Sequence, residues 1–179
     1  LRGCERVFHL AAAQHEANVA DSHFRQVNVE GVRRLIESCL SAGVERFVHG
    51  STIGVYGEAT ESALDEESRT NPQNIYGVTK LEGEKLALSY SEKLFVSAIR
   101  ISETYGPGDG RLLKLFRAIN SASFVMIGPG TNRRQLIHVD DLIDALWIAG
   151  EKQEARGEVF VVAGNEVMTT AETVEVISD

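Results

Sequence analysis

The chain has 179 residues, of which 43% are hydrophobic and 25% are charged, values ordinary for a folded globular protein. Its formal net charge of −8 argues against nucleic acid or an anionic membrane surface as a partner, and no apolar run is long enough to span a bilayer. Cys4 and Cys39 share no metal-ligand spacing, so we expect no metal site and two free, buried thiols in a reducing, cytoplasmic compartment.

The first element expected is a buried strand over residues 6–11, which runs into three alanines at 11–13. Small side chains at the end of a strand let a flat ligand approach the backbone, although plain packing would also explain them. The stretch 15–20 is polar and mixed, and we expect a loop or a frayed helix start there.

A helix follows, because apolar residues recur at helical spacing over 24–39. Asp21 or Ser22 would cap its start, and Gly43 is a natural residue just past its end. Asn28 falls on the buried face of this helix, where an amide bonded to the backbone is the simplest interpretation.

Two further strands are expected at 46–50 and 94–100, both short apolar runs. The first ends in S-T-I-G-V-Y-G at 51–57, and the second leads to Y-G-P-G-D at 105–109. Hydroxyls and glycines straight after a buried strand are typical of the carboxyl edge of an open sheet, where such folds bind ligands.

Tyr76 and Lys80 lie on a helix expected to start near Asn74 and to run toward Tyr90, after an acidic, polar stretch at 58–74. Side chains four apart share a helix face. A phenol titrates near ~10, so a base at neutral pH needs a pKa lowered by about 3–4 kcal/mol. A cation about 5 Å away supplies roughly 3 kcal/mol. Alone, this spacing also occurs by chance.

The C-terminal part is expected to contain a helix at 111–118, a turn at 128–130 and a strand at 158–163. A further helix should begin at Asp140 or Asp141. One side of it would carry Leu142, Ile143, Leu146 and Ala149. Thr169 and Glu172 form the pattern of a capping box that opens a last helix. His138 is flanked by apolar residues, so we interpret it as structural.

Three motifs follow one another along the chain: a strand with S-T-x-x-V-Y-G, then Y-x-x-x-K, then a strand with R-x-x-x-x-Y-G-P. This order resembles the extended short-chain dehydrogenase/reductases, which include the NAD-dependent sugar-nucleotide epimerases and dehydratases. Further matches lie at 7–12, 28–31 and 137–142, so that the resemblance runs nearly end to end. One such motif is weak, but five in the right order are strong.

The resemblance implies an α/β fold: a partial Rossmann-like doubly wound parallel sheet with part of a smaller substrate-binding domain. Residues 1–105 and 136–152 would form the dinucleotide-binding part, and 106–135 and 153–179 the substrate-binding part. The family's glycine-rich turn does not occur in this sequence. We therefore expect a fragment without the first βαβ units, and inactive in isolation.

The resemblance also implies NAD(P)-dependent oxidoreduction at a carbinol carbon. Tyr76 would exchange the hydroxyl proton, Lys80 would lower the pKa of Tyr76 and bind the nicotinamide ribose, and Thr52 would donate to the substrate oxygen. NAD is the expected cofactor, with NADP not excluded. The residues expected to bind it are Leu10, Ala11, Ala12, Asn28, Gly50, Ser51, Tyr76, Lys80 and Ile101. A homodimer would form through helices 22–42 and 75–90.

The substrate implied first is a nucleotide sugar, bound by Thr52, Glu103 and Arg134, the last at the diphosphate. An equally good interpretation is that the arginines at 133–134 are surface residues that bind no ligand. Dehydratases carry Asp-Glu after the threonine, where this chain has Ile-Gly at 53–54, which argues against dehydration. Epimerases usually carry Asn in place of Glu103, so a steroid-dehydrogenase-like or flavonol-reductase-like enzyme is an alternative. A non-catalytic dinucleotide-binding regulator is another.

Overall fold

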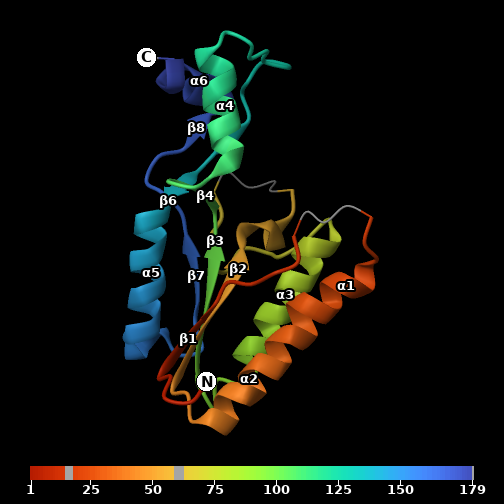
Figure 1. The fold of residues 1–179 in the computed structure, drawn as a ribbon, viewed down its shortest axis with the longest axis vertical. Helices are drawn as coiled ribbons and strands as arrows, with labels where there is room; N and C mark the ends of the chain where they lie inside the picture. Colours follow the sequence, from red (N-terminus) through yellow and green to blue (C-terminus); the bar gives the residue numbers. More distant parts are fainter. Residues whose placement is uncertain (15–17, 59–62, 179) are drawn as a thin grey trace. The chain divides into compact units, whose positions relative to one another are not determined.

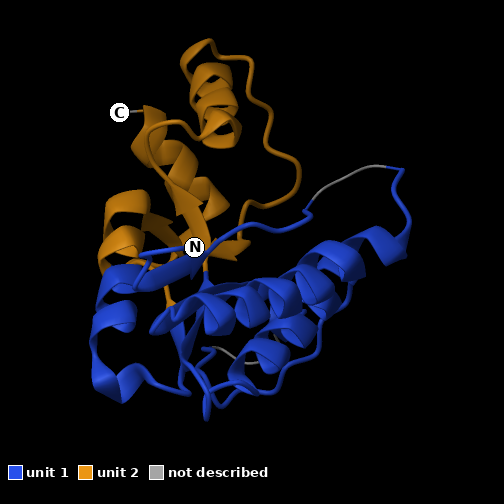
Figure 2. Ribbon diagram, turned by 60° about the horizontal axis from the view of Figure 1, so that its bottom comes forward, with its two compact units in different colours: residues 1–101, 145–161 blue, residues 102–144, 162–179 orange. Residues whose placement is uncertain are grey.

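A computed structural model describes residues 1–14, 18–58 and 63–178 of the chain. The chain divides into two compact units, residues 1–101 with 145–161 and residues 102–144 with 162–179 (Figure 2). Residues 153–161, which the sequence assigned to the substrate-binding part, cluster with the first unit. The expected loop at 15–20 and the acidic stretch at 58–74 lie partly outside the described residues.

The first unit is built on a four-stranded sheet in the order β1-β2-β3-β7 (Figure 1). Its strands are β1 (Arg6–His9), β2 (Arg46–Thr52), β3 (Phe95–Ile101) and β7 (Val159–Val162). β1 pairs with β2 in parallel, and β2 pairs with β3 in parallel. The strands lie where the sequence predicts them, although β1 ends at His9 rather than residue 11.

Both faces of the two central strands, β2 and β3, are buried, which explains why these strands are continuous apolar runs rather than alternating ones. Val7 pairs with Phe47, and Phe47 with Val96, so these side chains share one face and pack in the core under the helices. Phe8 and Val48 point to the other face. A Cβ built on Gly150 of α5 (Val139–Glu151) would lie 3.1 Å from Phe8 and 3.3 Å from Val48.

The helical segment after β1 contains a turn of π-helix. It consists of α1 (Asp21–Arg25), the π-helical η1 (Gln26–Glu30) and α2 (Gly31–Ala42). Gly43 ends α2 with a left-handed φ of 72°, as predicted. The predicted cap is wrong: Ala20 holds the N-cap position without a side-chain hydrogen bond, and Asp21 is already helical.

Helix α3 (Ile75–Leu88) begins where the sequence predicts, because the Asn74 side chain accepts a 2.8 Å hydrogen bond from the Gly77 N–H. The short 3-10 helix η2 (Ile53–Tyr56) precedes it in the chain. Glycine lets α3 pack closely at two places. A Cβ on Gly83 would lie 2.3 Å from the Asn28 carbonyl oxygen, and one on Gly77 would lie 2.8 Å from that of Gly54.

The second unit contains two small sheets. β4 (Glu103–Tyr105) pairs in parallel with β6 (Leu136–His138), and β5 (Arg133–Arg134) pairs antiparallel with β8 (Met168–Thr169). Helix α4 (Gly110–Asn120) is capped by Asp109. Helix α6 (Thr170–Ser178) starts with the predicted capping box, since Thr169 and Glu172 exchange hydrogen bonds of 2.7 Å and 3.1 Å. The short η3 (Gln153–Ala155) follows α5.

One prediction of burial is wrong. Cys39 is buried as expected, but Cys4 is exposed because it lies ahead of β1. On α5, Leu142, Leu146 and Ala149 are buried, whereas 55% of Ile143 is exposed. The helix starts at Val139, one residue before the predicted caps, and Asp140 and Asp141 lie in its first turn. Within the described residues, no helix is both long and apolar enough to cross a membrane.

Candidate active site at the end of strand β2

Thr52 and Tyr76 meet at the carboxyl end of β2, where their side chains share a hydrogen bond. Thr52 is the last residue of the strand, and its hydroxyl oxygen also accepts a 3.1 Å hydrogen bond from the Gly54 N–H, which caps η2. Tyr76 is the second residue of α3. Strand end and helix start are therefore fixed locally by caps, and these caps bring the two hydroxyls together.

Lys80 lies one helical turn after Tyr76, is only 3% exposed, and donates a hydrogen bond to the Gly50 carbonyl oxygen. Burial lowers the pKa of Lys80 to about 8, although the carboxylate of Glu84 acts in the opposite direction. An ammonium group has three donors, and one of them is used by Gly50. Two consecutive turns of α3 thus contact Thr52 and Gly50, at the end of β2.

Burial raises the pKa of Tyr76 above its ordinary value, and the hydrogen bond with Thr52 only partly offsets this effect. The sequence predicts that Lys80 lowers this pKa in the intact protein with its cofactor, and this stays a prediction. In the chain by itself, desolvation disfavours the phenolate, and the Lys80 ammonium donates to a backbone carbonyl.

The glycine at position 50 leaves room beside β2 for the side chains of Leu10, just after β1, and Ile101, at the end of β3. A Cβ on Gly50 would lie 2.7 Å from Leu10 Cδ2 and 3.5 Å from Ile101 Cδ1. Three of the residues predicted to bind the cofactor therefore surround one point at the sheet edge. Leu10 is 52% exposed, and Ala11 beside it is also exposed, so this edge presents small and apolar groups outward.

Asn28, in the π-helical turn η1, holds the chain after β1 in place. Its Oδ1 accepts from the Ala13 N–H at 2.8 Å, and its Nδ2 donates to the Ala13 carbonyl at 3.1 Å and to Thr79 Oγ1 at 3.0 Å. Both amide hydrogens are therefore committed to the protein. The structure fits the simpler interpretation of a core amide, which ties the end of β1 to helix α3.

A buried ion pair beneath the site was not predicted from the sequence. Glu84 and Arg100 are 2% and 6% exposed and form a two-pronged pair, with Arg100 Nη2 at 2.8 Å and Nε at 3.2 Å from the two carboxylate oxygens. Ser51 Oγ donates to Glu84 Oε2 at 2.6 Å, so its hydroxyl hydrogen is also committed. A signal existed, since Glu84 follows Lys80 by one turn and Arg100 ends an apolar run.

His9 and His49 were also missed. Their rings stack with centroids 5.6 Å apart, on the sheet face that carries Phe47. Burial, followed by the charge of Lys80, lowers the pKa of His9 to about 4 and lowers that of His49 well below its usual range. Neither ring nitrogen of His49 has a hydrogen-bond partner among the described residues. Both rings are therefore neutral at pH 7.

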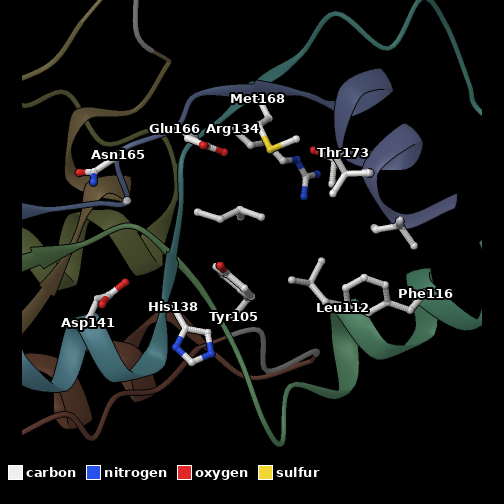
Figure 3. A pocket seen from close by; sticks show the side chains of 14 residues that line it. Tyr105, Leu112, Phe116, Arg134, His138, Asp141, Asn165, Glu166, Met168 and Thr173 are labelled. Carbon is white, nitrogen blue, oxygen red and sulfur yellow. The ribbon is translucent and has the colours of Figure 1, made fainter. Parts of the chain in front are cut away.

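In the second unit, Arg134 and Glu103 form an ion pair, with Arg134 Nη1 at 3.3 Å from both carboxylate oxygens. Arg134 also lines a cavity of about 400 Å³, into which its guanidinium points (Figure 3). The wall opposite includes Tyr105 and His138. His138 Nδ1 accepts a 3.3 Å hydrogen bond from the N–H of Asp140, consistent with a structural part for this ring.

The comparisons with known proteins agree with this geometry. Residues 1–163 match the family described as "NAD dependent epimerase/dehydratase family". The chain belongs to this family. Its α/β fold with a parallel sheet is that of the family's Rossmann-fold members, as the sequence predicts. Among described residues, no group of three or more His, Cys, Asp and Glu is arranged to hold a metal ion.

Relatives in this family act on or bind nucleotide sugars. A dTDP-glucose 4,6-dehydratase of Streptomyces niveus is 33% identical over 98% of the chain and 54% of its own length. A UDP-glucose 4-epimerase of Vibrio cholerae is 30% identical over 97% of the chain and 55% of its own length. The solved structure of MoeE5 in complex with UDP-glucuronic acid and NAD superposes with a TM-score of 0.87, at 32% identity, covering 99% of this chain and 62% of that one. The chain spans about half the length of the curated relatives it matches.

Proposed function

We propose that the protein carries out NAD(P)-dependent oxidoreduction at a carbinol carbon, with Tyr76 as the acid/base. The observation that supports this most directly is the hydrogen bond between Tyr76 and Thr52 at the end of β2, one helical turn from the buried Lys80. A proton-transferring phenol must lie within hydrogen-bond reach of the group it serves. A substrate hydroxyl placed beside this pair would bond to both Thr52 and Tyr76.

In this proposal Tyr76 accepts the proton of the substrate hydroxyl during oxidation and returns it during reduction. Thr52 orients the substrate oxygen. Lys80 supplies a positive charge that favours the phenolate, once its ammonium turns toward the phenol. Because burial alone raises the pKa of Tyr76, the site also needs a further positive charge beside it. The ring of oxidised NAD carries such a charge.

NAD, with NADP as the alternative, would act as the hydride acceptor and donor. The residues at the sheet edge fit the nicotinamide half. Gly50 keeps the strand surface flat, and Leu10, Ala11, Ala12 and Ile101 offer small or apolar contacts. Lys80 retains donors for ribose hydroxyls. Ser51 and Asn28 would act indirectly, since their hydrogens are already bound within the protein.

A nucleotide sugar is the first substrate class that we propose. The relatives named above support it, and Arg134 in its cavity is suited to a diphosphate. Ile53 and Gly54 provide no acid or base beside Thr52, which favours epimerase-type chemistry over dehydration. Glu103 supports the second class, a reductase of simple alcohols or ketones, because it already neutralises Arg134.

The assembly and the domain assignment are part of the same proposal. A homodimer would form through residues 22–42 and 75–90, the helices that cover one face of the sheet in Figure 1. The dinucleotide-binding part would comprise 1–105 and 136–152, and the substrate-binding part the remainder.

The proposal is tested on the intact protein with Tyr76→Phe, incubated with NAD and UDP-glucose. Phenylalanine keeps the ring but removes the phenol, so NAD binding measured by calorimetry should persist while turnover is lost by at least about a thousand-fold. Thr52→Val should retain binding and lose less turnover. Unchanged turnover in Tyr76→Phe would exclude the mechanism. NAD binding without turnover in the wild type would instead indicate a regulator or another substrate class.

A further inference from the structure

Helix α3 carries a third polar side chain in line with Tyr76 and Lys80. Glu84 lies one further helical turn along, on the same face of the helix. These three side chains bind three consecutive residues at the end of β2, 50–52. Tyr76 bonds to the hydroxyl of residue 52, Lys80 to the carbonyl of residue 50, and Glu84 to the hydroxyl of residue 51.

The Glu84 carboxylate is held from two strands at once. Ser51 on β2 donates to it at 2.6 Å, and Arg100 on β3 donates at 2.8 Å and 3.2 Å. Ser51 and Arg100 are partners in the β2–β3 register. Arg100 is fixed in turn by the Tyr56 hydroxyl at 2.8 Å and by the Glu66 carbonyl at 3.0 Å. Charge-assisted bonds of this kind define a position more sharply than apolar contacts.

Stability alone does not explain a buried ion pair at this place. Well-packed apolar side chains stabilise a core as well as a buried ion pair or better, because both charges must be desolvated. The pair lies instead one turn from a buried ammonium. Among the described residues, Glu84 is the one acidic group whose charge acts on Lys80, and the charge of Lys80 contributes to the lowered pKa of His9 and of His49 on the sheet.

We propose that Glu84 is a positioning residue for the active site: it fixes the register of α3 on β2, so that Tyr76 meets Thr52, and it places a carboxylate one helical turn from the Lys80 ammonium. The contribution of Glu84 to catalysis rests on the function proposed above, whereas its effect on Lys80 does not. Ser51 connects Glu84 to the strand, and Arg100 holds the carboxylate in place.

The test compares Glu84→Gln with Glu82→Gln in the full chain. Glu82 is the matched control, because it lies on the same helix and carries the same charge, but its partner is Arg25 at the surface. The ¹⁵N resonance of the Lys80 ammonium is followed against pH, without substrate or cofactor. Glu84→Gln should weaken proton binding by Lys80 about ten-fold or more, and Glu82→Gln should leave it unchanged. Equal titration of Lys80 in the two variants would refute the proposal.

A double variant separates positioning from folding. Glu84→Gln leaves the Arg100 charge buried without its partner and is expected to lower the melting temperature. Glu84→Gln/Arg100→Gln removes both charges and should recover most of that stability, while Lys80 still binds its proton about ten-fold more weakly. If the double variant restores the titration of Lys80 together with stability, Glu84 is only structural and the proposal fails.

A turnover measurement completes the test on the intact protein with NAD and UDP-glucose. In Glu84→Gln, kcat should fall at least about ten-fold with little change in KM, and the alkaline limb of its pH profile should move to lower pH. A rise in KM with an unchanged kcat would contradict a positioning role. If the wild type shows no turnover, the proposed function fails, and the titration of Lys80 still decides the part of Glu84.

Discussion

Replacing Asn28 with alanine should destabilise the first unit strongly, because one amide satisfies three buried partners. The side chain is 1% exposed and bonds to the Ala13 N–H, the Ala13 carbonyl and the Thr79 hydroxyl at 2.8–3.1 Å. Thr79 keeps other partners, the carbonyls of Ile75 and Tyr76, but Ala13 would lose both of its bonds to this amide.

The expected magnitude follows from these contacts. A buried polar group left without a partner costs about 1–3 kcal/mol, so two groups cost about 2–6 kcal/mol. A protein of this size has a total stability of about 5–15 kcal/mol, and 1 kcal/mol shifts its melting temperature by about 2–4 °C. We therefore expect Asn28→Ala to melt about 4–24 °C below the wild type.

The assay is thermal unfolding followed by circular dichroism, with Gln73→Ala as the control. Gln73 is an exposed amide that donates one 3.1 Å bond to the Asn71 carbonyl, and its loss should shift the melting temperature by about 2 °C at most. Asn28→Asp should resemble Asn28→Ala, because a carboxylate cannot donate to the Ala13 carbonyl. A melting temperature of Asn28→Ala within about 2 °C of the wild type would refute this reasoning.

Three further predictions concern packing, pH and ligand charge. Gly83→Ala should lower the free energy of unfolding in urea by about 2–4 kcal/mol, because its Cβ would lie 2.3 Å from a backbone carbonyl of the π-helical turn. Gly110→Ala is the control: nothing lies within 4 Å of its Cβ, so it should be neutral or slightly stabilising. The pKa of His9 is lowered to about 4 in the folded state, so the unfolded chain binds a proton first as the pH falls. The free energy of unfolding should therefore decrease between about pH 6.5 and pH 4, and this decrease should be smaller in His9→Gln. Glu103→Gln should tighten the binding of UDP in calorimetry by about five-fold, because it frees Arg134 and removes a negative charge, and weaker binding would count against a diphosphate at this place.

The elements that the sequence predicted well are those fixed by local rules. Asn74 caps α3 with its own side chain, Gly43 ends α2 with a positive φ, and Thr169 with Glu172 forms the capping box of α6. Each signal involves residues within one helical turn, so no tertiary contact is needed to interpret it.

Apart from the Asp21 cap, which was wrong by one residue, the features that the sequence missed depend on contacts between residues far apart in the chain. The pKa of Tyr76 rises because neighbouring elements bury the phenol, a quantity that the spacing from Lys80 does not contain. Glu84 and Arg100 are 16 residues apart, and their pairing arises only once β3 lies beside β2.

The sequence alone determined the order of the main helices and of the four strands of the first sheet, the family, and the presence of a tyrosine and a lysine on one helix face, since periodicity and motifs are properties of the chain itself. The tertiary structure decided which groups these side chains bind: Thr52 for Tyr76, the Gly50 carbonyl for Lys80, and the Ser51–Arg100 pair for Glu84. Burial and hydrogen bonding set the charge of each group, and both depend on how the sheet and its helices pack together.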